Sequence, residues 1–265
     1  MKLFSFRNFR ILMLLAIFAA VAIYSKSQLL TSTAWLEPLQ VSIYPINGDS
    51  DPKTARYIQN LSSHNFRDID NFMLSESKKF NILEETPTQT TLGPEVIDSP
   101  PPPPEIETRS ALSTMLWSLK LRYWVWKNTP DDKPNLNRVR IFVLYYQGND
   151  NQPLAHSLGI QKGLIGVVHA FANKKQNKQN NIVIAHELLH TVGASDKYDS
   201  NNQPIFPEGY AEPTRNPRYP QYRAEIMSGR IPSSPTDSQM AESLKRCIIG
   251  PRTAREINWS GGTQH

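Results

Sequence analysis

Apolar residues recur along the chain with the periods of strands and helices, and this pattern predicts the order of the elements. Residues 41–46 are typical of a first strand. Residues 52–80 have helical spacing, with a break expected at residues 62–63. Residues 105–127 form another helical stretch, whose broad apolar face we expect to pack in the core.

Two more strand candidates follow. Residues 139–146 are rich in β-branched and aromatic side chains, and residues 163–171 form a second candidate strand. A single histidine on a strand, here His169, is more often structural, and we leave it outside the ligand set. The end of the chain, residues 237–259, is expected to form two short helices separated by residues 250–251.

Residues 87–104 have a different composition. They are rich in Pro and Thr and end in five consecutive prolines. Such a run favours an extended polyproline II segment. It could bind an SH3-type domain, but no basic residues flank it, which favours a stiff connection inside the domain.

The first ten residues include three basic ones, Lys2, Arg7 and Arg10, and an apolar run from Ile11 to Tyr24 follows them. A membrane-spanning helix needs about 20 apolar residues, so this run suffices only if basic residues snorkel to the interface. We expect an uncleaved anchor over residues 1–26. The alternative is a cleaved signal peptide, with residues 20–22 as its Ala-x-Ala site. In both cases residues 27–265 form a domain on the non-cytoplasmic side, periplasmic in a Gram-negative cell, or secreted.

Most of the net charge belongs to the same N-terminal segment. The chain carries +5, and residues 1–26 hold four basic residues and no acid. Subtracting these four leaves +1 for residues 27–265, so the basic pI does not indicate nucleic-acid binding. Cys247 is the single cysteine, which excludes an internal disulfide.

An HExxH motif is the most informative feature of the chain. On a helix, positions i and i+4 share one face, so His186 and His190 can direct their imidazoles at one point. Glu187 is then placed as a general base rather than as a ligand, which is the arrangement of a catalytic zinc site. Gly193 can end the helix in a left-handed conformation, and the chain can return to deliver Asp196 as a third ligand.

A histidine on a helix is more often a satisfied core residue, and this interpretation has to be weighed. The residues around the motif are apolar on nearly all sides, which predicts a buried helix. Burying imidazoles and a carboxylate without partners would cost roughly 1–3 kcal/mol for each group. A zinc ion satisfies these groups together, so we favour the metal site.

Downstream, residues 225–229 read Glu-Ile-Met-Ser-Gly. With the HExxH motif, this segment resembles the metzincin metalloproteases, whose Met-turn places a methionine, here Met227, beneath the zinc. Most metzincins use a third histidine. The order HExxHxxGxxD, with Asp196 followed two residues later by Tyr198, is similar to the snapalysin type of small secreted bacterial proteases. The resemblance covers residues 180–230 and implies a metzincin-like α+β catalytic domain with a mixed sheet. In metzincin-like folds the strand that corresponds to residues 163–171 edges the cleft, where an extended substrate can pair with it.

The motif predicts a zinc-dependent hydrolase, and the resemblance implies a metalloendopeptidase that acts on peptides or proteins. The chemistry itself would also suit another amide. Glu187 would activate a water for attack on the peptide carbonyl. Tyr210, Tyr219 and Tyr222 are candidates to stabilise the oxyanion, and the spacing selects none of them. The alternative from another class is a membrane-tethered binding module that holds zinc without peptidase activity.

The third ligand has alternatives. In thermolysin-like enzymes it is a downstream glutamate, and Glu208, Glu212 and Glu225 are in range. Those enzymes present it from a second helix, which the Pro-rich sequence around the first two does not favour. Asp196 and Asp199 could instead belong to a calcium loop, but the ligand pattern of an EF-hand is missing. Asp196 is therefore the expected ligand.

Overall fold

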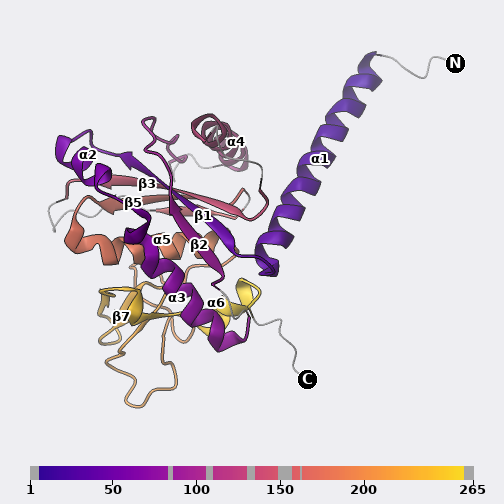
Figure 1. The fold of residues 1–265 in the computed structure, drawn as a ribbon. Coiled ribbons are helices and arrows are strands. Elements are labelled where there is room, and N and C mark those ends of the chain that lie inside the picture. Colours follow the sequence, from indigo (N-terminus) through magenta and orange to yellow (C-terminus); the bar gives the residue numbers. More distant parts are fainter. Residues whose placement is uncertain are drawn as a thin grey trace.

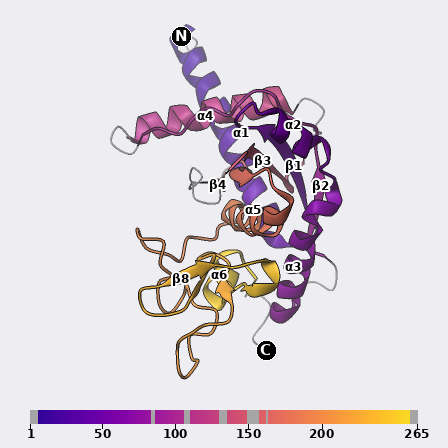
Figure 2. The ribbon, with the colours of Figure 1, turned by 90° about the vertical axis from the view of Figure 1, so that its left-hand side faces the viewer.

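A central sheet with helices on both faces forms the body of the molecule, and α1 (Phe6–Ala34) extends away from it (Figures 1 and 2). The structure is a computed structural model, which describes residues 6–82, 86–105, 110–129, 135–148, 157–161 and 163–259. The described chain is thus a mixed α/β protein with a mixed sheet and an apolar N-terminal helix.

The sheet has five strands in the order β2-β1-β3-β5-β4. The first four in this order run parallel, and β4 pairs antiparallel with β5 at one edge. Residues 43–46 of β1 and 141–146 of β3 are continuously apolar, as expected where helices cover both faces of a parallel sheet. The strands are β1 (Leu39–Asn47), β2 (Thr88–Leu92), β3 (Arg138–Tyr146), β4 (Leu158–Ile160) and β5 (Ile165–Phe171).

Helix α4 lies on one face of the sheet, and α5 and α3 lie on the other (Figure 2), where Ile58 of α2 packs in the same core cluster as these two helices. Leu121 and Val125 of α4 pack in a core cluster with Phe142 of β3. The larger core cluster lies on the opposite face. The helices are α4 (Ala111–Asn128) on the first face, and α2 (Pro52–Gln59), α3 (Arg67–Ser77) and α5 (Asn177–Thr191) on the second.

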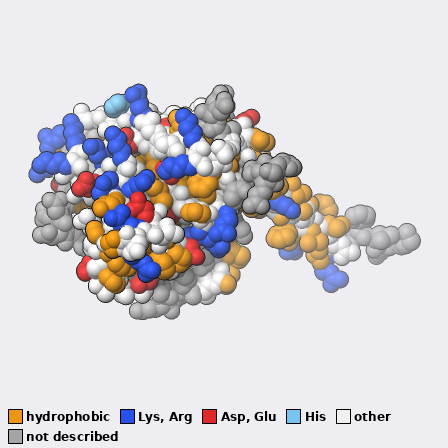
Figure 3. Space-filling view, turned by 90° about the horizontal axis from the view of Figure 1, so that it is seen from below, with side chains coloured by type: hydrophobic (Ala, Val, Ile, Leu, Met, Phe, Trp, Pro, Cys, Tyr) orange, Lys and Arg blue, Asp and Glu red, His pale blue; other side chains and the backbone are white. Residues whose placement is uncertain are grey.

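The N-terminal helix α1 is longer than the apolar run suggests. Residues 6–32 are long and apolar enough to cross a membrane, and signal sequences have the same character. Apolar side chains cover the surface of α1 where it stands clear of the body (Figure 3).

The C-terminal end of α1 is attached to the domain. Gln28 and Ser32 are buried. Immediately after the helix, the indole of Trp35 donates a hydrogen bond of 2.7 Å to the carbonyl of Ile257 and packs edge-to-face on Trp259. These contacts fix the direction in which α1 leaves the domain.

A strand lies within the Pro-rich segment that we expected to be a connection only. β2 pairs with β1, and its Thr88 and Thr90 are buried. Asp70 of α3 accepts hydrogen bonds of 2.7 Å from both hydroxyls. These tertiary contacts, rather than apolar alternation, make the segment a strand.

The expected helix over residues 237–250 is absent. This part of the chain consists of short strands and turns, because its backbone pairs with the segments around residue 225. The following helix, after Gly250, is present as expected. The elements are β6 (Ala224–Glu225), β7 (Arg230–Pro232), β8 (Ser238–Met240), the 3₁₀ turn η5 (Leu244–Arg246), β9 (Cys247–Ile248) and α6 (Pro251–Glu256).

We expected the broad apolar face of α4 to pack in the core, but most of its side chains are exposed. Only part of the helix packs on the sheet. The large apolar side chains that remain exposed are Leu112, Met115, Leu116, Leu119, Tyr123 and Trp126.

Close packing of β4 against α5 generates the first prediction. A Cβ added at Gly159 would lie 2.5 Å from the carbonyl oxygen of Glu187 and 2.6 Å from the Cβ of His190. We expect Gly159→Ala to lower the free energy of unfolding by about 1–3 kcal/mol, since α5 must shift. Gly166→Ala is the control, because its nearest contact is a side-chain atom of Ile141 at 3.3 Å. Equal stability of the two variants in denaturant unfolding would contradict the prediction.

Candidate metal centre

The second half of α5 carries the HExxH residues, and the helix ends as the sequence predicts. Gly193 has φ +110°, a conformation that favours glycine. Its N–H donates to the carbonyl of His190, and the N–H of Ala194 donates to that of Leu189. The chain therefore turns back immediately after the second histidine.

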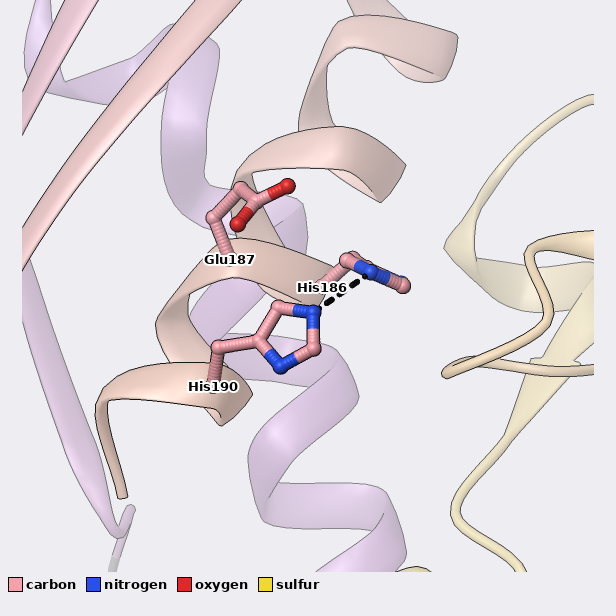
Figure 4. A group of neighbouring side chains, drawn as sticks. All are labelled: His186, Glu187 and His190. Carbon is pink, nitrogen blue, oxygen red and sulfur yellow. Dashed lines mark hydrogen bonds between the residues drawn. The ribbon is translucent and has the colours of Figure 1, made fainter. Parts of the chain in front are cut away.

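This turn brings three ligand atoms together. The Nε2 atoms of His186 and His190 are 3.0 Å apart (Figure 4). Oδ1 of Asp196 lies 3.1 Å from the first and 3.0 Å from the second. The three atoms form a nearly equilateral triangle, and all belong to residues predicted as ligands.

The opposite nitrogen of each ring determines what this triangle can hold. Nδ1 of His186 lies 3.0 Å from the carbonyl oxygen of Ile226, and Nδ1 of His190 lies 2.8 Å from that of Ala194. A carbonyl only accepts hydrogen bonds, so each Nδ1 carries a proton. In the neutral rings both Nε2 atoms then direct lone pairs at each other and at a carboxylate oxygen. This is unfavourable without a cation between them, so the residues fit a metal ion.

Glu187 lies beside the two histidines on α5. One carboxylate oxygen of Glu187 and one ring nitrogen of each histidine lie within 4.8 Å of one another. His186, Glu187 and His190 therefore form a group that can hold a metal ion. The side chain is buried, and Oε2 has no hydrogen-bond partner among the described residues. Burial raises the pKa of Glu187, and the neighbouring imidazoles oppose this shift. A buried carboxylate oxygen without a partner points to a further group at this position.

The pKa shifts also show that the site attracts positive charge. Burial lowers the pKa of His186, but the hydrogen bond to Asp196 and the charge of Glu187 outweigh it, so the net pKa is raised. Burial raises the pKa of Asp196, but the hydrogen bonds with His186 and His190 lower it well below its usual range. Both shifts favour a positive charge between Asp196 and the imidazole of His186.

The turn formed by residues 225–229 lies against the site. The N–H groups of Ser228 and Gly229 both donate to the carbonyl of Glu225, at 3.0 and 2.9 Å. Met227 is fully buried and follows the residue whose carbonyl holds His186. The turn therefore fixes one imidazole through its backbone and places the methionine in the core.

The alternative carboxylate ligands are engaged elsewhere. Glu225 is buried and accepts three hydrogen bonds, from two backbone N–H groups and a threonine. Glu212 lies near two arginines, and Glu208 is exposed. Asp199, the second member of the possible calcium loop, accepts N–H bonds from its own turn. Of these carboxylates and Asp196, Asp196 is the one that contacts both imidazoles.

A cleft of about 310 Å³ opens beside the histidines. His186, Glu187 and Tyr198 line it, and the ring of Tyr198 is stacked on that of His186 with the ring centroids 6.2 Å apart. Burial and the negative charge of Asp196 raise the pKa of Tyr198 to about 12, so its hydroxyl is protonated at neutral pH. The cleft also has apolar walls, which include Phe171, Ile182, Val183 and Met240.

Tyr198 is thus the tyrosine at the site, and the three proposed from the sequence are not. The hydroxyls of Tyr210 and Tyr219 bond each other at 2.8 Å, and Tyr222 is covered on one face by Arg215. None of these three lines the cleft described above. The available signal in the sequence was the position of Tyr198, two residues after Asp196.

The edge strand of the sheet beside α5 is β4. We expected β5 at this position. β5 lies between β3 and β4. His169 on β5 does line the cleft, and its Nδ1 is 3.1 Å from the hydroxyl of Tyr146. Burial lowers the pKa of His169.

Comparisons with known proteins do not define a family. Neither protein-family models nor curated proteins match the chain. Among solved structures, OgpA from Akkermansia muciniphila is similar at 11% identity and a TM-score of 0.34, over 82% of this chain and 58% of that one. The chain thus spans less than two thirds of that protein. A likeness this distant carries no argument about fold family or activity.

The triangle of ligand atoms predicts the metal content of variants. His186→Ala and His190→Ala should each lose the bound ion, and Asp196→Ala should weaken binding, because each removes one of three donors. Glu208→Ala, an exposed carboxylate nearby, is the control and should keep the ion. Elemental analysis of protein prepared without chelator measures the content. Wild type without any transition metal, or equal content in all variants, would contradict the assignment.

Proposed function

We propose that the protein is a zinc-dependent endopeptidase of the metzincin type, with its catalytic domain in residues 27–265 on the non-cytoplasmic side of a membrane. The observation that carries the proposal is the convergence of two Nε2 atoms and Oδ1 of Asp196 beside the buried carboxylate of Glu187. Two imidazoles and one carboxylate are a donor set that suits zinc. Three protein ligands leave a coordination position for chemistry.

Glu187 acts as the general base and then as the general acid. Bound zinc would supply Lewis-acid activation of a water and of the peptide carbonyl. Glu187 takes a proton from the attacking water and passes it to the departing amine. Burial raises the pKa of Glu187 above that of an ordinary carboxyl group, which favours uptake of the proton from the water.

Tyr198 stabilises the negative charge that develops on the carbonyl oxygen. Its raised pKa keeps the hydroxyl protonated, so it can donate a hydrogen bond. Tyr198 lines the cleft, and its ring is stacked on that of His186. Met227, in the buried turn behind His186, has the place of the Met-turn methionine.

A peptide in extended conformation is the substrate that fits this cleft. β4 is the edge strand beside α5, and a peptide can add to such an edge through backbone hydrogen bonds. The apolar wall formed by Phe171, Ile182 and Met240 favours an apolar side chain next to the scissile bond.

Replacement of Glu187 by Gln tests the catalytic role. The change is nearly isosteric and leaves His186, His190 and Asp196 in place, so metal content should be retained. Cleavage of a peptide library should fall by about 10²–10⁴-fold, because the base is lost. Glu208→Gln is the control and should cleave like wild type. Unchanged cleavage by Glu187→Gln would refute the mechanism, and a zinc-loaded wild type that cleaves nothing would favour a tethered binding module.

A second test removes only the hydroxyl of Tyr198. We expect Tyr198→Phe to lower kcat by about 10²–10³-fold with KM little changed, because the hydrogen bond forms mainly in the transition state. Tyr222→Phe, outside the cleft, should have no effect. Steady-state kinetics at matched metal content measures both, and a change confined to KM would count against the oxyanion role.

A further inference from the structure

The exposed apolar residues of α4 lie on a single face of the helix. Their spacing of three or four residues, with one adjacent pair, forms a continuous stripe. Each of these side chains is about half exposed or more. The opposite face of α4 is used for packing, since Leu121 and Val125 are buried and Trp124 lies edge-to-face on Phe142 at 4.7 Å. The six side chains of the α4 stripe are Leu112, Met115, Leu116, Leu119, Tyr123 and Trp126.

Basic side chains border the α4 stripe on both sides. At 3.6 residues per turn, Lys120 and Lys127 lie along one edge and Arg122 along the other. The helix contains no acidic residue. Lys127 also pairs at 3.0 Å with Asp98, outside the helix. An apolar stripe between basic edges, with Tyr and Trp in it, is the pattern of helices that lie in a membrane interface.

The position of α1 indicates where such an interface lies. A cavity of about 350 Å³ between α1 and α4 is lined by Tyr24 and Gln28 of the first helix and by Arg122 and Trp126 of the second. Tyr24 is also where the apolar run of α1 ends, and Lys26 follows it. α4 is therefore level with the end of the apolar part of α1.

The directions of the two helices agree with this placement. α1 continues outward past α4, on the side of the sheet that α4 covers (Figure 1). α4 lies across the top of the domain, whereas α1 rises behind it (Figure 2). A bilayer crossed by α1 would thus present its surface to the outer face of α4.

We propose that the α4 stripe inserts into the surface of the bilayer that α1 enters, with α4 in the plane of the interface and its basic edges against anionic phospholipid headgroups. The apolar side chains would then leave water, and the basic groups at the edges would remain at headgroup level. Two attachments would hold the domain: α1 through the bilayer and α4 on its surface.

Depth-dependent fluorescence in full-length protein tests this placement. In a Cys247→Ala background, a fluorescent NBD label is attached at Met115→Cys in the α4 stripe or, as the control, at Ser200→Cys in the exposed loop after α5. In vesicles of phosphatidylcholine and phosphatidylglycerol, the label at 115 should shift to the blue and be quenched by brominated lipid. The label at 200 should show neither effect. A label at 115 whose emission does not shift would overturn the proposal. A label that shifts to the blue but is not quenched by brominated lipid would also overturn it, because protein rather than lipid then covers the α4 stripe.

A charge placed in the α4 stripe provides the second measurement. Leu116→Glu and Leu119→Glu change exposed side chains, so the fold should persist by circular dichroism. Each change should reduce quenching at position 115, and Thr114→Glu, on the same helix outside the stripe, should reduce it less. Vesicles of phosphatidylcholine alone should also give less quenching, because the basic edges lose their partners. Quenching that neither the charge in the stripe nor the lipid composition alters would overturn the proposal.

Discussion

Two backbone carbonyl groups hold the imidazole rings of the candidate metal centre from behind. The carbonyl of Ile226 fixes His186, and that of Ala194 fixes His190. Because a carbonyl cannot donate, both rings must turn an Nε2 lone pair toward Asp196 or carry a positive charge. The position of these two carbonyls therefore decides whether the three ligand atoms converge.

The C-terminal part of the chain keeps both carbonyls in place. Glu225, buried within the turn, accepts hydrogen bonds from the N–H of Met227 and from the hydroxyl of Thr253 on α6. Lys197, next to Asp196, pairs at 2.8 Å with Glu256 on α6, and its N–H donates to the carbonyl of Met227. Helix α6 thus connects the two loops that orient the imidazoles. This helix therefore has a structural role at the site, although it is remote in sequence from the HExxH motif.

Local and non-local features of the fold differ in how far the sequence predicts them. The spacing of His186 and His190, and the turn at Gly193, depend on helix geometry alone, so the convergence with Asp196 could be predicted. Four of the residues 88–92 are polar, and the strand depends on pairing with β1 and on the bonds to Asp70. Residues 237–250 likewise follow their pairing partners rather than their own periodicity. For α4 the apolar pattern predicts burial, but not whether protein or lipid provides it.

The sheet separates the two surfaces for which we propose functions. α4 covers one face, and α5 with the candidate metal centre lies on the other (Figure 2). With α4 on the bilayer, the centre would face away from lipid, and its substrates would be chains that reach it through the aqueous compartment. A single helical tether with a loose linker would leave the domain free to tilt. Here Trp35 binds the end of α1 to the domain, so contact at α4 would fix the orientation of the cleft as well as its distance from the membrane.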